Sequence, residues 1–238
     1  MARPARLRLY CFPHAGGGMA SFHGWQEALG DRVAVCPARF PGRESRASEA
    51  PLRRMEELVA ALAAALSRRL DTPFAFFGHS MGAAVAFELT RFLRRNRQPQ
   101  PVALFVSAAR APQFRRDWKP GPEPDDEQLW EELRRLEGVP REVLENKELM
   151  RLVLPALRAD SALYRNYVYT EEPPLACPIW AYGGLNDPNV TREHLAAWAE
   201  QTTESFALRQ FPGGHFFLQS SEELFLRALA EDLAGLSV

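Results

Sequence analysis

Short apolar segments recur along the chain and alternate with longer amphipathic ones. The short segments are rich in Val, Leu, Ile and Phe and are bounded by Pro or Gly, a pattern typical of buried strands. The predicted strands cover residues 7–12, 33–36, 74–77, 102–107, 179–182 and 206–211. Apolar residues at helical spacing predict helices over 52–70, 81–95, 192–200 and 222–233. This alternation predicts an α/β fold with a mostly parallel central sheet and helices on both faces.

One long segment interrupts the alternation, because residues 111–170 contain no convincing strand. The segment opens with a loop rich in Pro and acidic residues, and helical patterns follow over 127–137 and 147–169. A structureless connection of this length is uncommon in a compact domain. We therefore predict that 1–238 is a single domain in which 111–170 forms an inserted helical lid. An ordinary crossover helix with a long connection is the alternative.

Composition excludes several classes of protein. The 238 residues are 46% hydrophobic and carry a formal net charge of −1. Nucleic-acid binding is not expected, because neutralising phosphates requires a surplus of Lys and Arg. No apolar run approaches the roughly 20 residues of a membrane span, so no membrane association is expected. Four arginines at helical spacing predict a solvated helix face, namely Arg91, Arg94, Arg95 and Arg97.

The three cysteines are Cys11, Cys36 and Cys177. Their odd number and wide spacing do not suggest a disulfide framework, and all three lie in apolar, strand-like segments where a free thiol behaves as a small buried hydrophobe. Free thiols are typical of a reducing compartment, and the N-terminal apolar stretch is too short for a signal peptide. We therefore expect a cytoplasmic protein.

The most informative local motif is Gly-His-Ser-Met-Gly at 78–82. It matches the G-x-S-x-G nucleophile elbow, and its context fits, since a predicted strand precedes it and a predicted helix follows. The turn from strand to helix must be tight to raise the serine above the sheet, and side chains at the flanking positions would clash there. We therefore predict Ser80 as the nucleophile of an α/β-hydrolase fold. The alternative is a Gly-rich turn in which Ser80 only caps the helix.

A serine nucleophile needs a general base, and the base needs an acid to orient it. After an elbow the acid precedes the histidine along the chain. His215 follows a predicted strand and a Gly pair, whereas His194 lies within a helical pattern. Asp187 is the carboxylate in the loop after the strand at 179–182, whereas its competitor Asp160 lies in the inserted segment. The predicted triad is Ser80, Asp187 and His215.

Hydrolysis through an acyl-enzyme also needs two backbone N–H donors for the oxyanion. The elbow supplies one, from Met81. The Gly-rich loop at 13–18 follows the first predicted strand and offers the second, for which we favour Ala15 over Gly16. We expect His14 to shape this loop rather than to act as a base. A phosphate-binding loop is the rival interpretation, but the Lys-Ser/Thr ending of a P-loop is missing.

These motifs together resemble a known family, the discrete type II thioesterases that accompany polyketide synthases and non-ribosomal peptide synthetases. The resemblance runs in the family's order over nearly the whole chain. Its most specific parts are FPHAGG at 12–17 and LRAD at 157–160. The other matching segments lie at 40–44, 78–82, 187–188 and 214–217.

The resemblance implies an editing enzyme that hydrolyses aberrant or stalled acyl groups from the phosphopantetheine arm of acyl or peptidyl carrier proteins. It implies a helical lid and carries Ser80, Asp187 and His215 into the triad, with Ala15 and Met81 in the oxyanion hole. No metal or other cofactor is expected, and we expect a monomer. The alternatives are a chain-releasing thioesterase, a general carboxylesterase or acyl-CoA thioesterase, and a non-catalytic interaction protein of the same fold.

Overall fold

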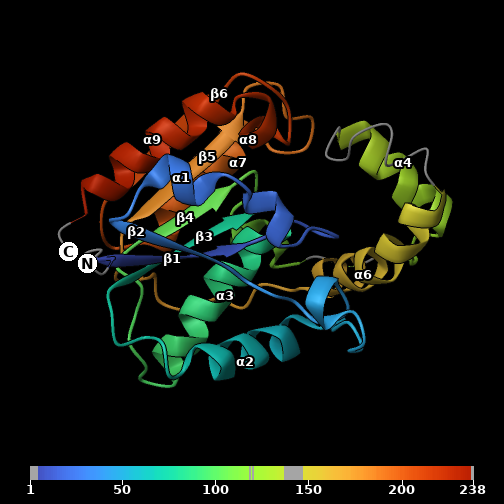
Figure 1. Ribbon diagram of the computed structural model, residues 1–238, viewed down its shortest axis with the longest axis horizontal. Coiled ribbons are helices and arrows are strands. Elements are labelled where there is room, and N and C mark those ends of the chain that lie inside the picture. Colours follow the sequence, from blue (N-terminus) through green and yellow to red (C-terminus); the bar gives the residue numbers. More distant parts are fainter. Residues whose placement is uncertain (1–4, 118, 120, 137–146, 237–238) are drawn as a thin grey trace.

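A computed structural model describes residues 5–117, 119, 121–136 and 147–236 (Figure 1). Six strands form one sheet in the order β2-β1-β3-β4-β5-β6, and every pair of neighbours is parallel. The predicted fold class is therefore confirmed. The strands are β1 (Leu7–Phe12), β2 (Val33–Pro37), β3 (Phe74–His79), β4 (Leu104–Ser107), β5 (Ile179–Gly184) and β6 (Phe206–Phe211).

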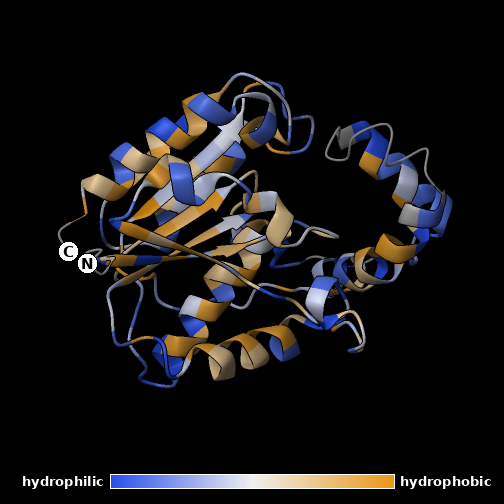
Figure 2. Cartoon of the chain, viewed as in Figure 1, coloured by the Kyte–Doolittle hydropathy of each residue, from blue (hydrophilic) through white to orange (hydrophobic). Residues whose placement is uncertain are grey.

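Helices cover both faces of this sheet (Figure 1). α2 and α3 pack on one face, and α1 and α9 lie together on the other. The strands are largely hydrophobic, whereas these helices are apolar on the side toward the sheet (Figure 2). Their bounds are α1 (Trp25–Leu29), α2 (Met55–Leu66), α3 (Met81–Arg95), α7 (Arg192–Ala196), α8 (Phe217–Ser220) and α9 (Glu222–Ala234).

The register of the strands brings their carboxyl ends together. His79 at the end of β3 is level with Ser107 of β4, and Ser107 is level with Tyr182 of β5. Loops that leave these strands therefore meet at one edge of the sheet, which is where ligands bind in open α/β folds.

Between β4 and β5 the structure has helices, and its described part contains no strand there. α4 (Asp126–Leu136) and α6 (Lys147–Asn166) stand to one side of the sheet (Figure 1), and Pro155 lies inside α6. Leu129 and Leu133 of α4 form a small apolar cluster with Met150 and Leu157 of α6. Glu137, at which we predicted the first of these helices to end, lies outside the described residues.

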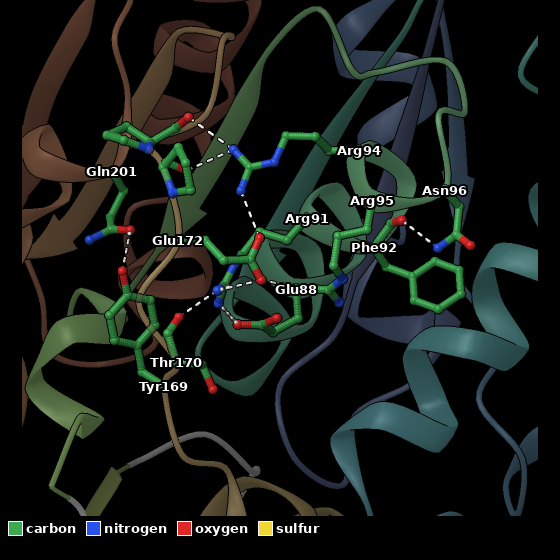
Figure 3. Close-up of polar contacts among 12 residues, drawn as sticks. Glu88, Arg91, Phe92, Arg94, Arg95, Asn96, Tyr169, Thr170, Glu172 and Gln201 are labelled. Carbon is green, nitrogen blue, oxygen red and sulfur yellow. Dashed lines mark hydrogen bonds and ion pairs between the residues drawn. The ribbon is translucent and has the colours of Figure 1, made fainter.

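The predicted solvated face is wrong for Arg91, which is buried, and only partly right for Arg94, which is half-buried, whereas Arg95 and Arg97 are exposed as predicted. Arg91 is only 2% exposed; its Nη1 lies 2.6 Å from Glu88, and its Nη2 lies 2.8 Å from Glu172. Arg94 and Arg95 also bind Glu172, at 2.8 and 2.5 Å (Figure 3). Helical spacing alone does not reveal this contact, since Glu172 lies on the distant segment that follows α6. The network ties that segment to the helix that begins after Ser80.

The structure also bears on the predictions made for membrane spans and for the three cysteines. No helix in the described part of the chain is both long and apolar enough to cross a membrane. All three thiols are free, and Cys11 and Cys177 are buried as predicted, but Cys36 is only half-buried because β2 is an edge strand.

Candidate active site

Ser80 sits at the junction of β3 and α3, in the turn that the motif predicts. Its φ of 56° and ψ of −118° lie in a region that residues with a side chain rarely adopt. The Ser80 N–H donates to the carbonyl oxygen of Ser107 at 2.7 Å, which ties the strained turn to the end of β4. Such strain persists only where the surroundings hold it, and it is typical of active sites.

Both glycines of the motif are required by close backbone contacts. A Cβ on Gly78 would lie 2.1 Å from the carbonyl oxygen of Gly82, and a Cβ on Gly82 would lie 2.1 Å from that of Phe12. Neither neighbour is a flexible side-chain tip, so neither can move away cheaply. The glycines therefore let β3, α3 and the end of β1 approach one another, and this packing places Ser80 beside the loop that follows β1.

The structure brings the three predicted triad residues together. The Nε2 of His215 lies 3.0 Å from Ser80 Oγ, and its Nδ1 lies 2.7 Å from Asp187 Oδ2. His215 follows β6, and Asp187 follows β5, so each side chain comes from a loop at the carboxyl edge. This arrangement allows the imidazole to take a proton from the serine while the carboxylate holds its orientation.

The Asp187 carboxylate is held in its ionised form. Burial raises its pKa, but the hydrogen bond and charge of His215 and the N–H groups of Asn189 and Val190 outweigh burial, so the pKa of Asp187 lies below its usual value. Asn189 and Val190 donate to Oδ1 at 2.8 and 3.1 Å, while Oδ2 faces His215. Each oxygen thus has its own partners, which fixes the rotation of the carboxylate.

Of the two N–H groups considered as oxyanion donors in the Gly-rich loop, one already donates a hydrogen bond within the protein. The Gly16 N–H donates to Asp160 Oδ2 at 2.8 Å, whereas the Ala15 N–H has no acceptor among the described residues. The Met81 N–H belongs to the first turn of α3, where a helix has no internal acceptor for its N–H groups. Ala15 and Met81 both line the cavity that contains Ser80.

Asp160 is not an alternative triad acid, because it binds Arg43 on the other side of the Gly-rich loop. The carboxylate and guanidinium form two parallel hydrogen bonds of 2.7 Å, and the side chains are 2% and 9% exposed. Arg43 also donates to the carbonyl oxygen of Gly17 at 2.8 Å. Arg43 therefore has a structural role, since its partners are a buried carboxylate and a backbone carbonyl oxygen. This buried pair clamps the loop between α6 and the segment after β2.

Two further histidines lie close to His215. Burial and the neighbouring His215 and Arg43 lower the pKa of His14 to about 4, and burial with His215 and His14 lowers that of His79 well below its usual value. The His14 ring lies against Gly17 and packs edge-on against Phe216 at 4.8 Å. His14 thus shapes the Gly-rich loop, as expected. Sequence analysis had assigned no role to His79, whose Nδ1 bonds the Ser107 hydroxyl at 2.9 Å.

Ser80 and His215 open into a cavity of about 430 Å³. Its walls come from the Gly-rich loop, the ends of β4 and β5, and the helices between them. The large apolar and aromatic side chains that α4 and α6 contribute to the lining are Leu129, Leu133, Leu157 and Tyr164. Trp130 and Leu154 are not among the described residues that do so. His194, the histidine that the sequence analysis passed over, completes a capping box with Thr191 at the start of α7.

A match to a known protein family shows which family this chain belongs to. Residues 7–234 match the thioesterase domain family. The chain belongs to this thioesterase family. The gramicidin S biosynthesis protein GrsT of Aneurinibacillus migulanus is 42% identical over 232 residues, which cover 96% of this chain and 90% of the relative.

Solved structures agree with this thioesterase assignment. The RedJ thioesterase of the prodiginine pathway in Streptomyces coelicolor matches with a TM-score of 0.89 and 42% identity, over 97% of this chain and 89% of that one. The type II thioesterase BorB of the borrelidin cluster matches with a TM-score of 0.86 and 40% identity, over 97% and 95% of the two chains. The resemblance to type II thioesterases is therefore confirmed.

Because the backbone of Phe12 lies so close to Gly82, adding one methyl group at Gly82 should strongly destabilise this thioesterase. Gly82→Ala forces β1 and α3 apart, and we expect it to lower the free energy of unfolding by about 1–3 kcal/mol or more. Urea denaturation measures this change. Gly235→Ala is the control, because a Cβ there has its nearest contact at 3.5 Å. Equal stability of the two variants would contradict the close packing at the elbow.

Removing Asp160 leaves Arg43 as a buried charge without its partner. We expect Asp160→Ala to lower the free energy of unfolding by about 3–5 kcal/mol, the cost of breaking a buried ion pair from one side. Glu223→Ala, which removes an exposed pair with Arg227, is expected to change stability little. Thermal denaturation compares the two, and an unchanged melting temperature for Asp160→Ala would show that the clamp does not hold the fold.

The low pKa of His14 predicts a loss of stability in mild acid. The folded state resists protonation down to about pH 4, whereas the unfolded chain binds the proton near pH 6.5. The stabilisation is therefore complete above pH 6.5 and falls as the pH drops toward 4, by about 2 kcal/mol at pH 5. Urea midpoints at pH 7.5 and 5.0 measure this loss. His14→Gln should reduce the difference and His23→Gln should preserve it; identical pH dependence in both would refute the assignment.

Proposed function

We propose that this chain is an editing thioesterase that hydrolyses acyl groups from the phosphopantetheine arm of acyl or peptidyl carrier proteins. The observation that carries the proposal is the hydrogen-bonded chain from Ser80 through His215 to Asp187, which opens into a cavity in a member of the thioesterase family. The names of relatives support the pathway, since GrsT is a gramicidin S biosynthesis protein and BorB a type II thioesterase.

In the proposed first step, Ser80 Oγ attacks the thioester carbonyl carbon while His215 Nε2 takes its proton. The carbonyl oxygen becomes an oxyanion that the N–H groups of Ala15 and Met81 stabilise. Removing one such donor typically costs about 10²–10³ in rate. When the carbonyl re-forms, the C–S bond breaks and His215 returns its proton to the leaving pantetheine sulfur. The acyl group is then an ester of Ser80, and Asp187 has stabilised the transient imidazolium.

In the second step, water takes the place of the thiol. His215 removes a proton from the water, whose oxygen attacks the acyl carbon, and the same two N–H groups bind the new oxyanion. The C–O bond to Ser80 then breaks, and His215 protonates the serine oxygen. The free acid leaves and the enzyme regains its starting state. Every proton in both steps passes through His215 Nε2, so the residues of this chain complete the hydrolysis.

We further propose that α4 and α6 form a lid within a single domain, with residues 111–170 as the insertion. Leu129, Leu133 and Leu157 line the cavity, so an acyl chain attached to Ser80 would contact these apolar side chains. The free thiols support a reducing, cytoplasmic setting. The alternatives that the same site permits are release of a finished product and hydrolysis of simple esters or acyl-CoA.

The central test is the nucleophile. Ser80→Ala keeps its packing, and we expect it to fold like the parent protein and lose nearly all hydrolysis of an acyl-carrier protein. Loss of covalent labelling by a fluorophosphonate probe should accompany the loss of turnover. Ser67→Ala, at the exposed end of α2, is the control and should retain both. Full turnover by folded Ser80→Ala would overturn the mechanism.

The substrate class is tested with the parent enzyme. We expect an acyl-carrier protein to be hydrolysed with a higher kcat/KM than a p-nitrophenyl ester of the same acid. Much faster turnover of the simple ester would favour a general carboxylesterase and contradict the editing function.

A further inference from the structure

Two arginines meet at the edge of the cavity, one from the body and one from the helices between β4 and β5. Arg110 follows β4, and its Nε donates to the carbonyl oxygen of Asn189 at 2.9 Å. Arg135 belongs to α4, and its Nη2 donates to the side-chain oxygen of the same Asn189 at 3.2 Å. Both guanidinium groups are therefore held beside one residue, and Asn189 and Arg110 both line the cavity that contains Ser80.

Among the residues that the structure describes, neither arginine forms an ion pair with a carboxylate. Many arginines in the described part of the chain form ion pairs, as Arg43 does with Asp160 and Arg91 with Glu88. The partners that Arg110 and Arg135 have in the described part of the chain are instead neutral oxygens of Asn189, and both residues are exposed. Among the described residues, neither Nη nitrogen of Arg110 has a partner. Like charges held together in this way favour an anionic ligand between them.

Besides Arg110, the acidic and basic side chains that line the cavity in the described part of the chain are Arg115, Glu132 and Arg165. Glu132 lies on α4 and lines the cavity, but it forms no ion pair with either arginine among the described residues. Arg115 and Arg165 also line the cavity, and they donate to backbone oxygens of Tyr164 and Gly121.

We infer that Arg110 and Arg135 bind the phosphodiester of the phosphopantetheine arm. The inference rests on the proposed function, which brings such an arm to this cavity. Guanidinium groups match phosphate oxygens with paired N–H donors, and phosphate is the anionic group of that arm.

The position of Arg110 suits the length of the arm. Arg110 lies three residues beyond Ser107, whose carbonyl oxygen accepts the Ser80 N–H at 2.7 Å. Three extended residues span at most about 11 Å, and the side chain adds to that reach. Pantetheine is as long as roughly four extended residues, on the order of 15 Å. A thioester at Ser80 therefore allows the phosphate to reach the two arginines at the edge of the cavity.

The experiment compares two small substrates that differ only in the phosphate, an acyl-phosphopantetheine and the corresponding acyl-pantetheine. We expect the parent enzyme to prefer the phosphorylated thioester through a lower KM, and the preference to weaken as salt is raised. Arg110→Gln and Arg135→Gln should each reduce this preference roughly fivefold to tenfold, as expected for a partly exposed charge-assisted hydrogen bond. Arg110→Lys should retain part of it.

Arg32→Gln is the matched control, because Arg32 is exposed and precedes β2 at the opposite edge of the sheet. It should keep the full preference. A parent enzyme with no preference for phosphate, or variants that slow both thioesters by the same factor, would overturn the phosphate site. The parent enzyme would show no preference for phosphate if Arg110 and Arg135 instead bound acidic side chains of the carrier protein.

The test is separate from that of the proposed function. Inhibition of p-nitrophenyl ester hydrolysis by phosphopantetheine, relative to pantetheine, reports on the two arginines even if carrier-bound thioesters are poor substrates. The editing function is tested separately, by measuring how fast the parent enzyme hydrolyses an acyl-carrier protein. Stronger inhibition by phosphopantetheine that both glutamine variants abolish would support the site, and equal inhibition by the two compounds would refute it.

Discussion

Between His79 and Met81 the chain changes from strand to helix over one residue, and the packing of that turn governs the rest of the site. Ser80 holds a backbone conformation that costs about 1–3 kcal/mol, and it persists because β1, β4 and α3 all contact the turn. Since Gly82 touches the backbone of Phe12, the same contact places the Gly-rich loop next to the serine. The nucleophile and the loop opposite it are therefore positioned by one packing interaction.

Buried polar groups surround this turn, and several form specific hydrogen bonds, although Arg43 Nε and His79 Nε2 have no partner among the described residues. Asp160 and Arg43 hold the Gly-rich loop from outside, and His14 lies under it toward His215. Such networks are costly when incomplete, so each contact restricts the backbone to one arrangement. Because the Gly16 N–H is bound to Asp160, the loop presents Ala15 to the cavity. The carboxylate of the ion pair thus occupies the Gly16 amide and leaves the Ala15 amide without an acceptor among the described residues.

The helices between β4 and β5 contact the body through a few specific interactions. Leu157 reaches the Gly-rich loop, Glu172 ties the exit of α6 to α3, and Arg135 meets Asn189 beside the catalytic acid loop. The cavity lies between these helices and the carboxyl edge of the sheet. A ligand in it would touch both parts at once, which links the position of α4 to what occupies the site.

The strands, the parallel sheet and the candidate triad of Ser80, Asp187 and His215 could all be predicted from the sequence. These features depend on local periodicity and on a turn whose sterics demand glycine at fixed spacing, so they can be predicted from neighbouring residues. The partners of Arg43, Arg91 and Asp160, and the shared contact of Arg110 and Arg135 with Asn189, become visible only in the folded chain. Such contacts join side chains from distant segments, and charge patterns along a helix do not show which distant segment will cover it. Burial and long-range ion pairing are properties of the folded chain, and here they shape the surroundings of the residues that local sequence had identified.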